Sequence, residues 1–510
     1  AAWDARRRRA VVARDRLGVK PLYYAEAGDV VVFASELKSL LASGLVGTEL
    51  DYEAIDAFLT LGFVPGPMTP LRAVRKLMPG HRLVVEPERV RTEAYWSYPE
   101  PAPEEMSLDE AGERLLGALE EAVRLRLMSD VPLGAMLSGG LDSSLIVALM
   151  ARNMTSPVKT FSVGFAEAGE GNELADARFV ADYFGTDHHE LELSFSEQSV
   201  DLAELLWSLD EPIADLSTLG FLALSQLAAT EVTVALSGQG ADELLGGYRK
   251  HQAAALAGSW KRLPRPLEAA GNALLGHAPA RFGQAARTLT AADPVQRLMV
   301  ASTRLDPALR DELARGPLAE LDGGTAQRLA YERLGSASTD PLAAALYLDG
   351  QLDLVDHLLH YFDRVSMAHS LEVRVPFLDH EVVELCAAIP TRHKVHRLDT
   401  KHVLKHAARG LVPASAIGKR KVGFFQGVAD GWFRAQARGA ISDYLLGPSP
   451  RYAEILDPRG IERLVAKHLE DPGSRHTYGL LSVLMLEIWL STYLPRATQP
   501  APAREEVVVR

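Results

Sequence analysis

The sequence predicts an α/β protein built around a doubly wound parallel sheet, and two features of the middle of the chain carry this prediction. Between about residues 130 and 250, short apolar runs alternate with segments of helical periodicity, as they do in parallel sheets covered by helices. Two of these runs end directly in glycine-rich loops. Because loops at the carboxyl ends of parallel strands share one crevice, the sequence predicts a binding site there.

The region before the sheet is expected to consist of strands and turns. Residues 10–24 hold β-branched and aromatic side chains around a glycine, which indicates two strands joined by a tight loop. Short helices are expected near residues 35–42 and 51–61. The arginines at residues 6–9 are interpreted as a solvated hairpin tip.

A proline-rich segment follows, and it is the best candidate for a linker. Directly after it, Ser107 precedes Glu110 by three positions, which is the capping-box start of a long helix. The expected divisions are residues 1–100, a linker at 101–107, a second domain at 108–495 and a frayed tail at 496–510.

Within the second domain, the elements of the sheet are expected in a regular order. The predicted strands are residues 131–137, 158–165, 188–194 and 232–238, and the predicted helices include residues 143–153 and 174–184. From about residue 250 to 495 the sequence is rich in Ala, Leu and Arg with helical periodicity. We expect this part to be mostly helical and packed on the sheet.

Composition excludes several classes of function. The 510 residues include 54 Lys and Arg against 67 Asp and Glu, and a net charge of −13 disfavours binding to nucleic acid or anionic membranes. The longest charge-free apolar stretches are shorter than the roughly 20 residues of a membrane span, so none is expected. The single cysteine, Cys386, excludes a disulfide framework and fits a reducing, cytoplasmic setting.

The sharpest chemical feature is the loop Leu137-Ser138-Gly139-Gly140-Leu141-Asp142-Ser143-Ser144, placed between a strand and a helix. Its glycines let the backbone approach an anion, and the helix N-terminus and serine hydroxyls supply donors. The loop therefore predicts a phosphate cradle, although no Walker motif is present. Asp142 is interpreted as a ligand of Mg²⁺ shared with the phosphates, the alternative being a simple helix cap.

The second loop, Ser237-Gly238-Gln239-Gly240-Ala241-Asp242-Glu243, follows the last predicted strand. If both loops line one crevice, Asp242 can reach the same Mg²⁺ from the opposite side. Helix capping by Asp242 is again the alternative.

These two loops, together with SLEVRVPFLDH at residues 370–380 and KRKVGF at residues 419–424, resemble glutamine-dependent asparagine synthetase of the B type. The first loop alone is shared with the ATP pyrophosphatase superfamily of adenylating amidotransferases. The resemblance extends from Trp3 to about Tyr493. It implies an ATP pyrophosphatase domain with a helical C-terminal part, preceded by a partial glutaminase domain of the Ntn type.

The resemblance also implies the residues of a Mg-ATP site. Those expected to bind ATP or pyrophosphate are Leu137, Ser138, Gly139, Gly140, Asp142, Ser143, Ser144, Val163, Ser237 and Gly238. Those expected to hold Mg²⁺ are Asp142 and Asp242.

Two residues are implied to be catalytic. Lys421 lies where the family has a lysine beside the acyl-phosphate, and a cation there would stabilise the charge that develops as pyrophosphate leaves. Gln239 stands where the family usually has Glu or Asp. A glutamine can orient an amine but cannot take its proton, so Gln239 weakens the inference that aspartate and ammonia are the substrates.

Substrate contacts are expected from Asp215, Asp363 and Glu372. Asp215 lies in an acidic segment suited to an ammonium group. Asp363 and Glu372 alternate with arginines, and we expect most of these charges to form an internal ion-pair scaffold.

The implied activity is ATP-dependent conversion of aspartate to asparagine through β-aspartyl-AMP, releasing AMP and pyrophosphate. In the family, a cysteine after the initiator Met releases ammonia from glutamine. That cysteine is missing here and Cys386 lies on an apolar helical face, so we expect this chain to use free ammonia. A homodimer is a family expectation only.

Two alternatives remain open at this stage. One is a related adenylating amidotransferase or β-lactam synthetase-like enzyme that acts on another carboxylate. The other is a non-catalytic ATP-binding partner protein. A tRNA-modifying enzyme is disfavoured because the chain has no basic appendage.

Overall fold

A five-stranded parallel sheet lies at the centre of the computed structural model, which describes residues 1–194, 201–260, 286–419, 429–436, 439–470 and 476–499. Its strand order is β10-β9-β8-β11-β12. The strands are β8 (Leu133–Met136), β9 (Lys159–Phe165), β10 (Asp187–Leu193), β11 (Val234–Leu236) and β12 (Glu372–Arg374). The chain adds strands on one side of β8 and then crosses to the other side, so the order reverses between β8 and β11. This arrangement confirms the predicted doubly wound sheet.

Helices cover both faces of this sheet. They include α3 (Leu108–Arg126), α4 (Leu141–Asn153), α5 (Leu174–Phe184), α6 (Leu202–Leu209), α7 (Ser217–Ala229) and α8 (Ala241–Leu245). Successive strand residues enter opposite cores: Ala135 packs in the core with α3 and α4, and Met136 packs in the core with α6 and α7. Because both faces of the sheet are buried at its inner strands, β8, β9 and β11 appear in the sequence as apolar runs.

The edge strand β12 was not predicted. It pairs in parallel with β11, with Val234 opposite Glu372. The strand has only three residues, and the charged side chains at its two ends obscure the apolar signal of Val373. Its place in the sheet depends on a partner far away in the sequence.

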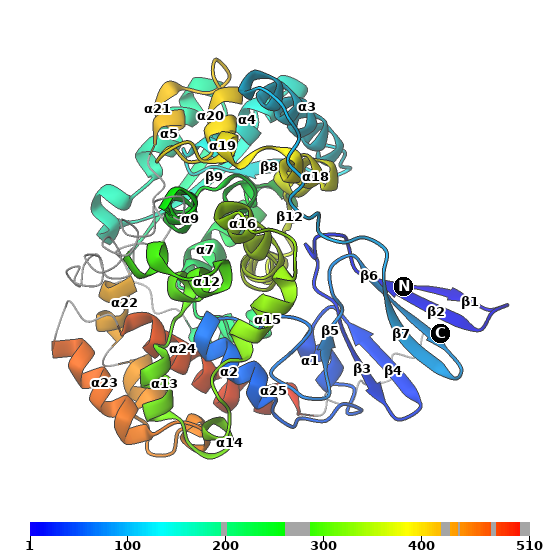
Figure 1. The fold of residues 1–510 in the computed structure, drawn as a ribbon, viewed down its shortest axis with the longest axis vertical. Helices are drawn as coiled ribbons and strands as arrows, with labels where there is room; N and C mark the ends of the chain where they lie inside the picture. Colours follow the sequence, from blue (N-terminus) through cyan, green and yellow to red (C-terminus); the bar gives the residue numbers. More distant parts are fainter. Residues whose placement is uncertain (195–200, 261–285, 420–428, 437–438, 471–475, 500–510) are drawn as a thin grey trace.

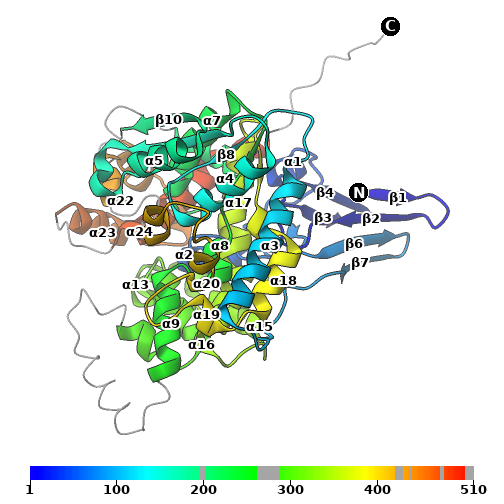
Figure 2. The same ribbon diagram turned by 90° about the horizontal axis from the view of Figure 1, so that it is seen from above.

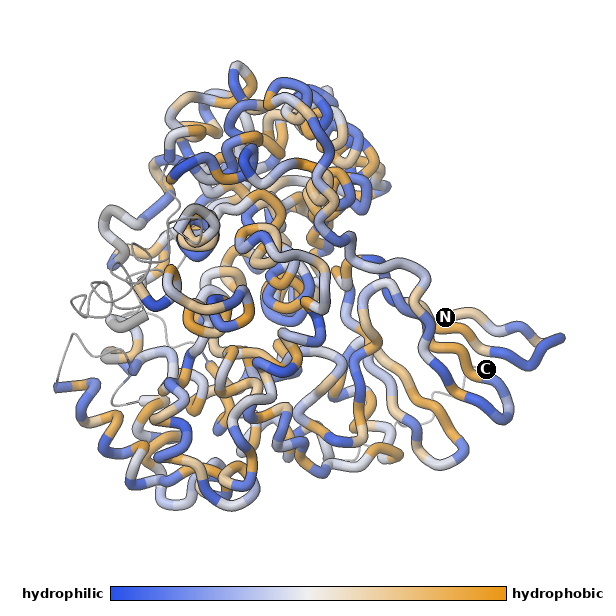
Figure 3. Tube along the Cα trace, in the orientation of Figure 1, coloured by the Kyte–Doolittle hydropathy of each residue, from blue (hydrophilic) through white to orange (hydrophobic). Residues whose placement is uncertain are grey.

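The N-terminal region forms two antiparallel sheets, as the strand-rich pattern predicted. One has the order β1-β2-β6-β7 and the other β4-β3-β5. The strands are β1 (Ala2–Asp4), β2 (Arg9–Ala13), β3 (Tyr23–Ala27), β4 (Val30–Ala34), β5 (Arg75–Lys76), β6 (His81–Glu86) and β7 (Arg89–Ala94). Figures 1 and 2 show the β1–β2 and β6–β7 hairpins extending away from the helical body. In Figure 3 the strands of these hairpins mix hydrophobic and hydrophilic residues, and the tip of the β1–β2 hairpin is hydrophilic, which fits the predicted arginine-rich tip.

The two short helices expected in this region are also present. They are α1 (Leu37–Leu41) and α2 (Tyr52–Leu61). Asp51 caps α2 by accepting a hydrogen bond from the backbone N–H of Ala54. Both helices pack into the core that holds α6 and α7, so the N-terminal region is continuous with the second domain.

The expected linker lies against the second domain. The backbone N–H groups of Ala102 and Glu104 donate to the carbonyls of Ala387 and Ala388, over 3.2 and 2.9 Å. Ser107 then caps α3 by accepting from the N–H of Glu110, as the capping-box pattern predicted.

The C-terminal region is mostly helical, as expected. Its helices up to the last strand of the sheet are α9 (Arg249–Trp260), α12 (Pro294–Ser302), α13 (Pro307–Leu313), α14 (Gly316–Ala319), α15 (Thr325–Leu334), α16 (Pro341–Gln351), η2 (Asp353–Leu359) and α17 (His360–Met367). Those that follow include α18 (His380–Ala388), α19 (Thr391–Lys394), α20 (His402–Ala407), α21 (Ala414–Gly418), α22 (Ala429–Ala435), α23 (Pro458–Glu470), α24 (Thr477–Ile488), η7 (Trp489–Tyr493) and α25 (Leu494–Ala497).

The continuous helix Thr477–Ala497 is long and apolar enough to cross a membrane by length and composition. However, 78% of its apolar window is buried inside the protein, which is typical of a core helix. It packs with α6 and α2 rather than presenting an apolar surface.

Candidate active site

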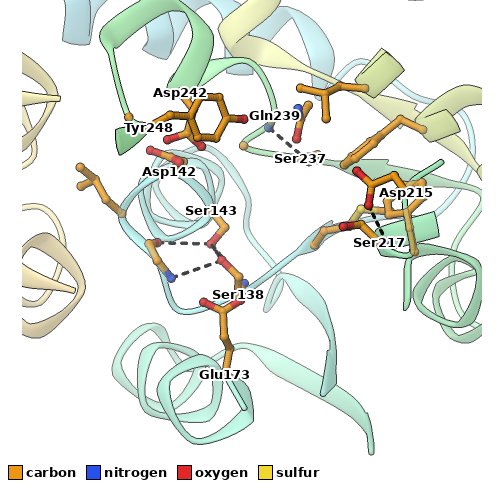
Figure 4. Close-up of a pocket in the computed structure, with 18 of the residues that line it drawn as sticks. Ser138, Asp142, Ser143, Glu173, Asp215, Ser217, Ser237, Gln239, Asp242 and Tyr248 are labelled. Carbon is orange, nitrogen blue, oxygen red and sulfur yellow. Dashed lines mark hydrogen bonds between the residues drawn. The ribbon is translucent and has the colours of Figure 1, made fainter. Parts of the chain in front are cut away.

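A cavity of about 650 Å³ opens where the strand order reverses, and both glycine-rich loops line it (Figure 4). This is the crevice that the sequence predicted from the strand ends. Of the predicted site residues, the cavity is lined by Leu137, Ser138, Gly140, Asp142, Ser143, Val163, Asp215, Ser237, Gly238, Gln239 and Asp242.

The first loop turns into α4 with its backbone donors available. The N-cap of α4 is Gly140 and no side chain caps this end, so Asp142 is not the helix cap. The Ser143 hydroxyl lies 3.1 Å from that of Ser138 and holds the loop closed. Gly139 has φ +68°, and a Cβ there would lie 2.4 Å from the carbonyl carbon of Asp176, so only glycine fits.

The two loops pack directly against each other. A Cβ on Gly238 would lie 2.8 Å from the backbone nitrogen of Ser143 and 2.9 Å from the carbonyl carbon of Asp142. Contacts this short leave no room for a side chain. Glycine in the second loop therefore lets Asp142 and Asp242 approach one another.

A lysine that sequence reasoning missed joins these two carboxylates. The Nζ of Lys401 lies 2.5 Å from Asp142 Oδ2 and 2.6 Å from Asp242 Oδ1. Lys401 is buried and has φ +52°, a conformation that residues other than glycine rarely adopt. Its segment, DTKHVLKH, is rich in basic residues with no distinctive spacing, so the sequence carries no signal for this role.

The convergence of two carboxylates on one cation shows that this point favours positive charge. Carboxylate oxygens are also the ligands that Mg²⁺ prefers, and Mg²⁺ usually binds one or two of them together with phosphate oxygens. The pair Asp142 and Asp242 fits that pattern. Within the described ranges, no cluster of three or more His, Cys, Asp or Glu side chains is arranged to hold a metal.

A second polar group lies on the other side of the cavity, where Figure 4 shows Asp215 and Ser217. The Nε2 of His357 lies 3.0 Å from Asp215 Oδ2, and its Nδ1 lies 2.8 Å from Asp353 Oδ1. Burial opposes ionisation of Asp215, but the hydrogen bond with His357 lowers the pKa of Asp215 to about 2. His357 and Asp353 were not predicted as site residues, because they come from a helical segment without a motif.

The asparagine synthase family model matches residues 114–491 of this chain. The chain belongs to this family. A glutamine amidotransferase domain model matches residues 1–96. Both matches agree with the resemblance inferred from the four motifs.

Relatives from several organisms support this membership. Asparagine synthetase [glutamine-hydrolyzing] 1 of Bacillus subtilis is 31% identical over 417 residues, covering 81% of this chain and 65% of that protein. A Mycobacterium bovis protein provisionally named asparagine synthetase [glutamine-hydrolyzing] is 30% identical, covering 98% of this chain and 77% of its own length. Amidase chry2 of Gibberella zeae is 28% identical over 80% of this chain and 66% of its own length. This chain thus spans less than two thirds of the Bacillus subtilis relative.

Several predicted site residues lie outside the cavity. Ser144 is fully buried on α4, and Gly139 lies behind the loop against α5. Asp363 forms an ion pair with Lys20, with Oδ1 2.6 Å from Nζ, and Glu372 pairs with Arg374 across 2.9 Å.

Only the first residue of the KRKVGF motif, Lys419, lies within the described residues. Lys421 lies outside the described residues. Its neighbour Lys419 lines the cavity, and its Nζ lies 3.0 Å from the carbonyl oxygen of Ser138 and 2.8 Å from Glu173 Oε1. A cation from this motif therefore lies at the first loop. Cys386 is buried in α18, and burial raises the pKa of its thiol to about 11, as expected of a core cysteine.

His357 is expected to make stability depend on pH. Burial opposes its charge, but hydrogen bonds with Asp215 and Asp353 raise the pKa of His357 from 6.5 to about 9. Because the folded-state value is the higher one, the stabilisation is complete below the unfolded pKa and is lost as pH rises through 9. A shift of this size corresponds to about 3 kcal/mol.

The free energy of unfolding, measured in urea at intervals between about pH 6 and pH 10, tests this expectation. The wild type should lose stability across this range more steeply than the variant His357→Asn. Parallel curves for the two proteins would contradict it.

Proposed function

We propose that this chain is an asparagine synthetase that converts aspartate to asparagine through β-aspartyl-AMP, at the expense of ATP. The observation that carries the proposal is the pair Asp142 and Asp242, joined by the Lys401 ammonium beside an uncapped helix N-terminus. N–H donors that can bind an anion lie next to a pair of carboxylates here, and this combination suits a metal-bound triphosphate. Membership of the asparagine synthase family supports the same chemistry.

In the first step, a carboxylate oxygen of aspartate attacks the α-phosphorus of ATP, and the bond to the pyrophosphate oxygen breaks. The loop around Ser138 and the N–H groups of α4 bind the leaving phosphates. Asp142 and Asp242 would hold Mg²⁺, which neutralises phosphate charge when bound. Lys401, Lys419 and, on the family pattern, Lys421 supply positive charge as pyrophosphate leaves.

In the second step, ammonia attacks the acyl carbon, the bond to AMP breaks, and a proton is lost to solvent. Gln239 lines the cavity from the second loop, and its side-chain amide can orient the incoming ammonia. Glutamine cannot accept the proton, so this chain would depend on water or another base for that transfer. The setting we propose is the cytoplasm, where the lone buried thiol stays reduced.

The test is AMP release from Mg-ATP with aspartate and ammonium, measured by chromatography together with asparagine. We expect AMP and asparagine in equal amounts, only when both substrates are present, and a separate reaction with glutamine replacing ammonium reports the ammonia source. ATP binding without AMP formation from aspartate would contradict the proposal. AMP formation with another carboxylic acid from a panel would then identify a related amidotransferase.

A further inference from the structure

We infer that Arg304 binds the α-carboxylate of the amino-acid substrate, at the end of the cavity that holds Asp215 and His357. This inference rests on the proposed function, because it assigns the subsite for the second substrate. Four observations about Arg304 carry it: its place in the cavity, its fixed backbone, its stacking partner and its buried, unpaired Nε.

Arg304 lies where two cavities adjoin. It lines the main cavity and also a smaller one of about 130 Å³ that reaches Leu61 and Phe63 of the N-terminal region. Lys250 and Asp353 line both cavities as well. The guanidinium therefore belongs to an open space next to the Asp353–His357–Asp215 cluster.

The backbone of Arg304 is fixed against α2. Its N–H donates to the carbonyl of Thr60 over 2.8 Å. Gly62 ends α2 with φ +85°, and a Cβ there would lie 3.1 Å from Cγ and Nε of Arg304. Glycine at this position thus leaves room for the arginine side chain to pass.

The guanidinium stacks on an aromatic ring, and its positive charge also acts on the nearby carboxyl groups of Asp215 and Asp353, where it lowers the pKa. Its central carbon lies 4.8 Å from the centre of the Tyr478 ring. Within the part of the chain that the structure describes, no carboxylate forms an ion pair with Arg304, and its buried Nε has no hydrogen-bond partner. Burying this donor without an acceptor is costly. Because the Nε is enclosed by protein atoms, a ligand in the cavity would meet the terminal nitrogens of the guanidinium.

The chemistry around Arg304 suits an α-amino acid. A guanidinium presents two parallel donors that match a carboxylate. Asp215 and Asp353, which line the same cavity, place negative charge where the α-ammonium group of such a substrate would be favoured. The side-chain carboxylate would then be left for reaction at the nucleotide end. The other anion that an arginine could bind here is a phosphate of ATP.

The experiment compares ligands that differ by one group, using the full chain. Aspartate serves as substrate, and two inhibitors compete with it: succinate, which lacks the α-ammonium, and β-alanine, which lacks the α-carboxylate. In the variant Arg304→Met we expect the KM for aspartate and the inhibition constant of succinate to rise about 100-fold. The inhibition constant of β-alanine and the KM for ATP should change less than about twofold.

Two variants accompany this comparison. Arg304→Lys keeps the positive charge but lacks the two parallel N–H donors of a guanidinium, so it should recover part of the affinity for aspartate. Arg315→Met removes an exposed arginine that pairs with Asp457 and should leave every constant unchanged. Thermal unfolding of each variant reports folding.

The possible failures are distinguishable. Equal weakening of succinate and β-alanine by Arg304→Met would overturn the inference in favour of a structural role. A rise in the KM for ATP alone would place the guanidinium at a phosphate instead. Absence of aspartate-dependent AMP in the wild type would overturn the proposed function, and this inference with it.

Discussion

Replacement of Asp142 by Asn is expected to lower the rate of AMP formation about 1,000-fold at saturating ATP. The variant keeps the shape of the side chain but removes its negative charge. In the wild type, that charge and the charge of Asp242 both face the Lys401 ammonium group. On the proposed function, that charge would help to hold Mg²⁺ beside the phosphates, so its loss should remove stabilisation from the leaving pyrophosphate. Asp242→Asn should have a comparable effect.

The measurement is the rate of AMP release, together with the affinity for ATP by calorimetry at several Mg²⁺ concentrations. Folding should be largely retained, because Lys401 keeps one carboxylate partner in either single variant. The matched control is Asp182→Asn, which removes an exposed carboxylate from α5. If both Asp142→Asn and Asp242→Asn kept more than about a tenth of the activity, the carboxylate pair would not be the metal site.

The second large effect is expected at the contact between the N-terminal region and the second domain. Lys76, on β5, is buried, and its Nζ lies 2.6 Å from the carbonyl oxygen of Val64 and 3.0 Å from Glu211 Oε2. It also lies 3.3 Å from Asp356 Oδ1. Burial already raises the pKa of Glu211, although the Lys76 charge opposes that rise.

The variant Lys76→Met should therefore destabilise the protein by about 3–5 kcal/mol, because it leaves two buried carboxylates without their cation. Urea unfolding measures this loss. Adding Glu211→Gln should restore part of the stability, since it removes one of the two uncompensated charges. Arg72→Met breaks an exposed ion pair with Glu49 and should change stability by less than about 1 kcal/mol. Equal effects of Lys76→Met and Arg72→Met would contradict the argument.

The Lys76 cluster also connects the N-terminal region with the cavity. Asp356 directly precedes His357, and Glu211 lies four positions before Asp215. The carboxyl group of Glu211 further accepts a hydrogen bond of 2.7 Å from the hydroxyl of Tyr23. Loss of Lys76 therefore removes support from both chain segments that carry the Asp215–His357 pair.

The sequence alone determined the parts of this protein that have local physical causes. Apolar runs indicated the inner strands β8, β9 and β11 because both faces of the sheet are buried there, and the capping pattern located the start of α3 at Ser107. The loops around Ser138 and Ser237 were found because glycines and hydroxyls at strand ends suit phosphate binding. Their meeting in one crevice followed from the parallel sheet.

Only the tertiary structure decided which distant side chains complete the site. Lys401, His357 and Arg304 lie more than 60 residues beyond the second loop, His357 in a helical segment and the other two in loops before or between helices, where a basic residue has no distinguishing neighbours. The same holds for the strand β12. Helix and strand patterns report which face of an element is buried, because burial repeats with the period of the backbone. They do not report which partner lies across the interface, since that depends on packing between elements far apart in the chain.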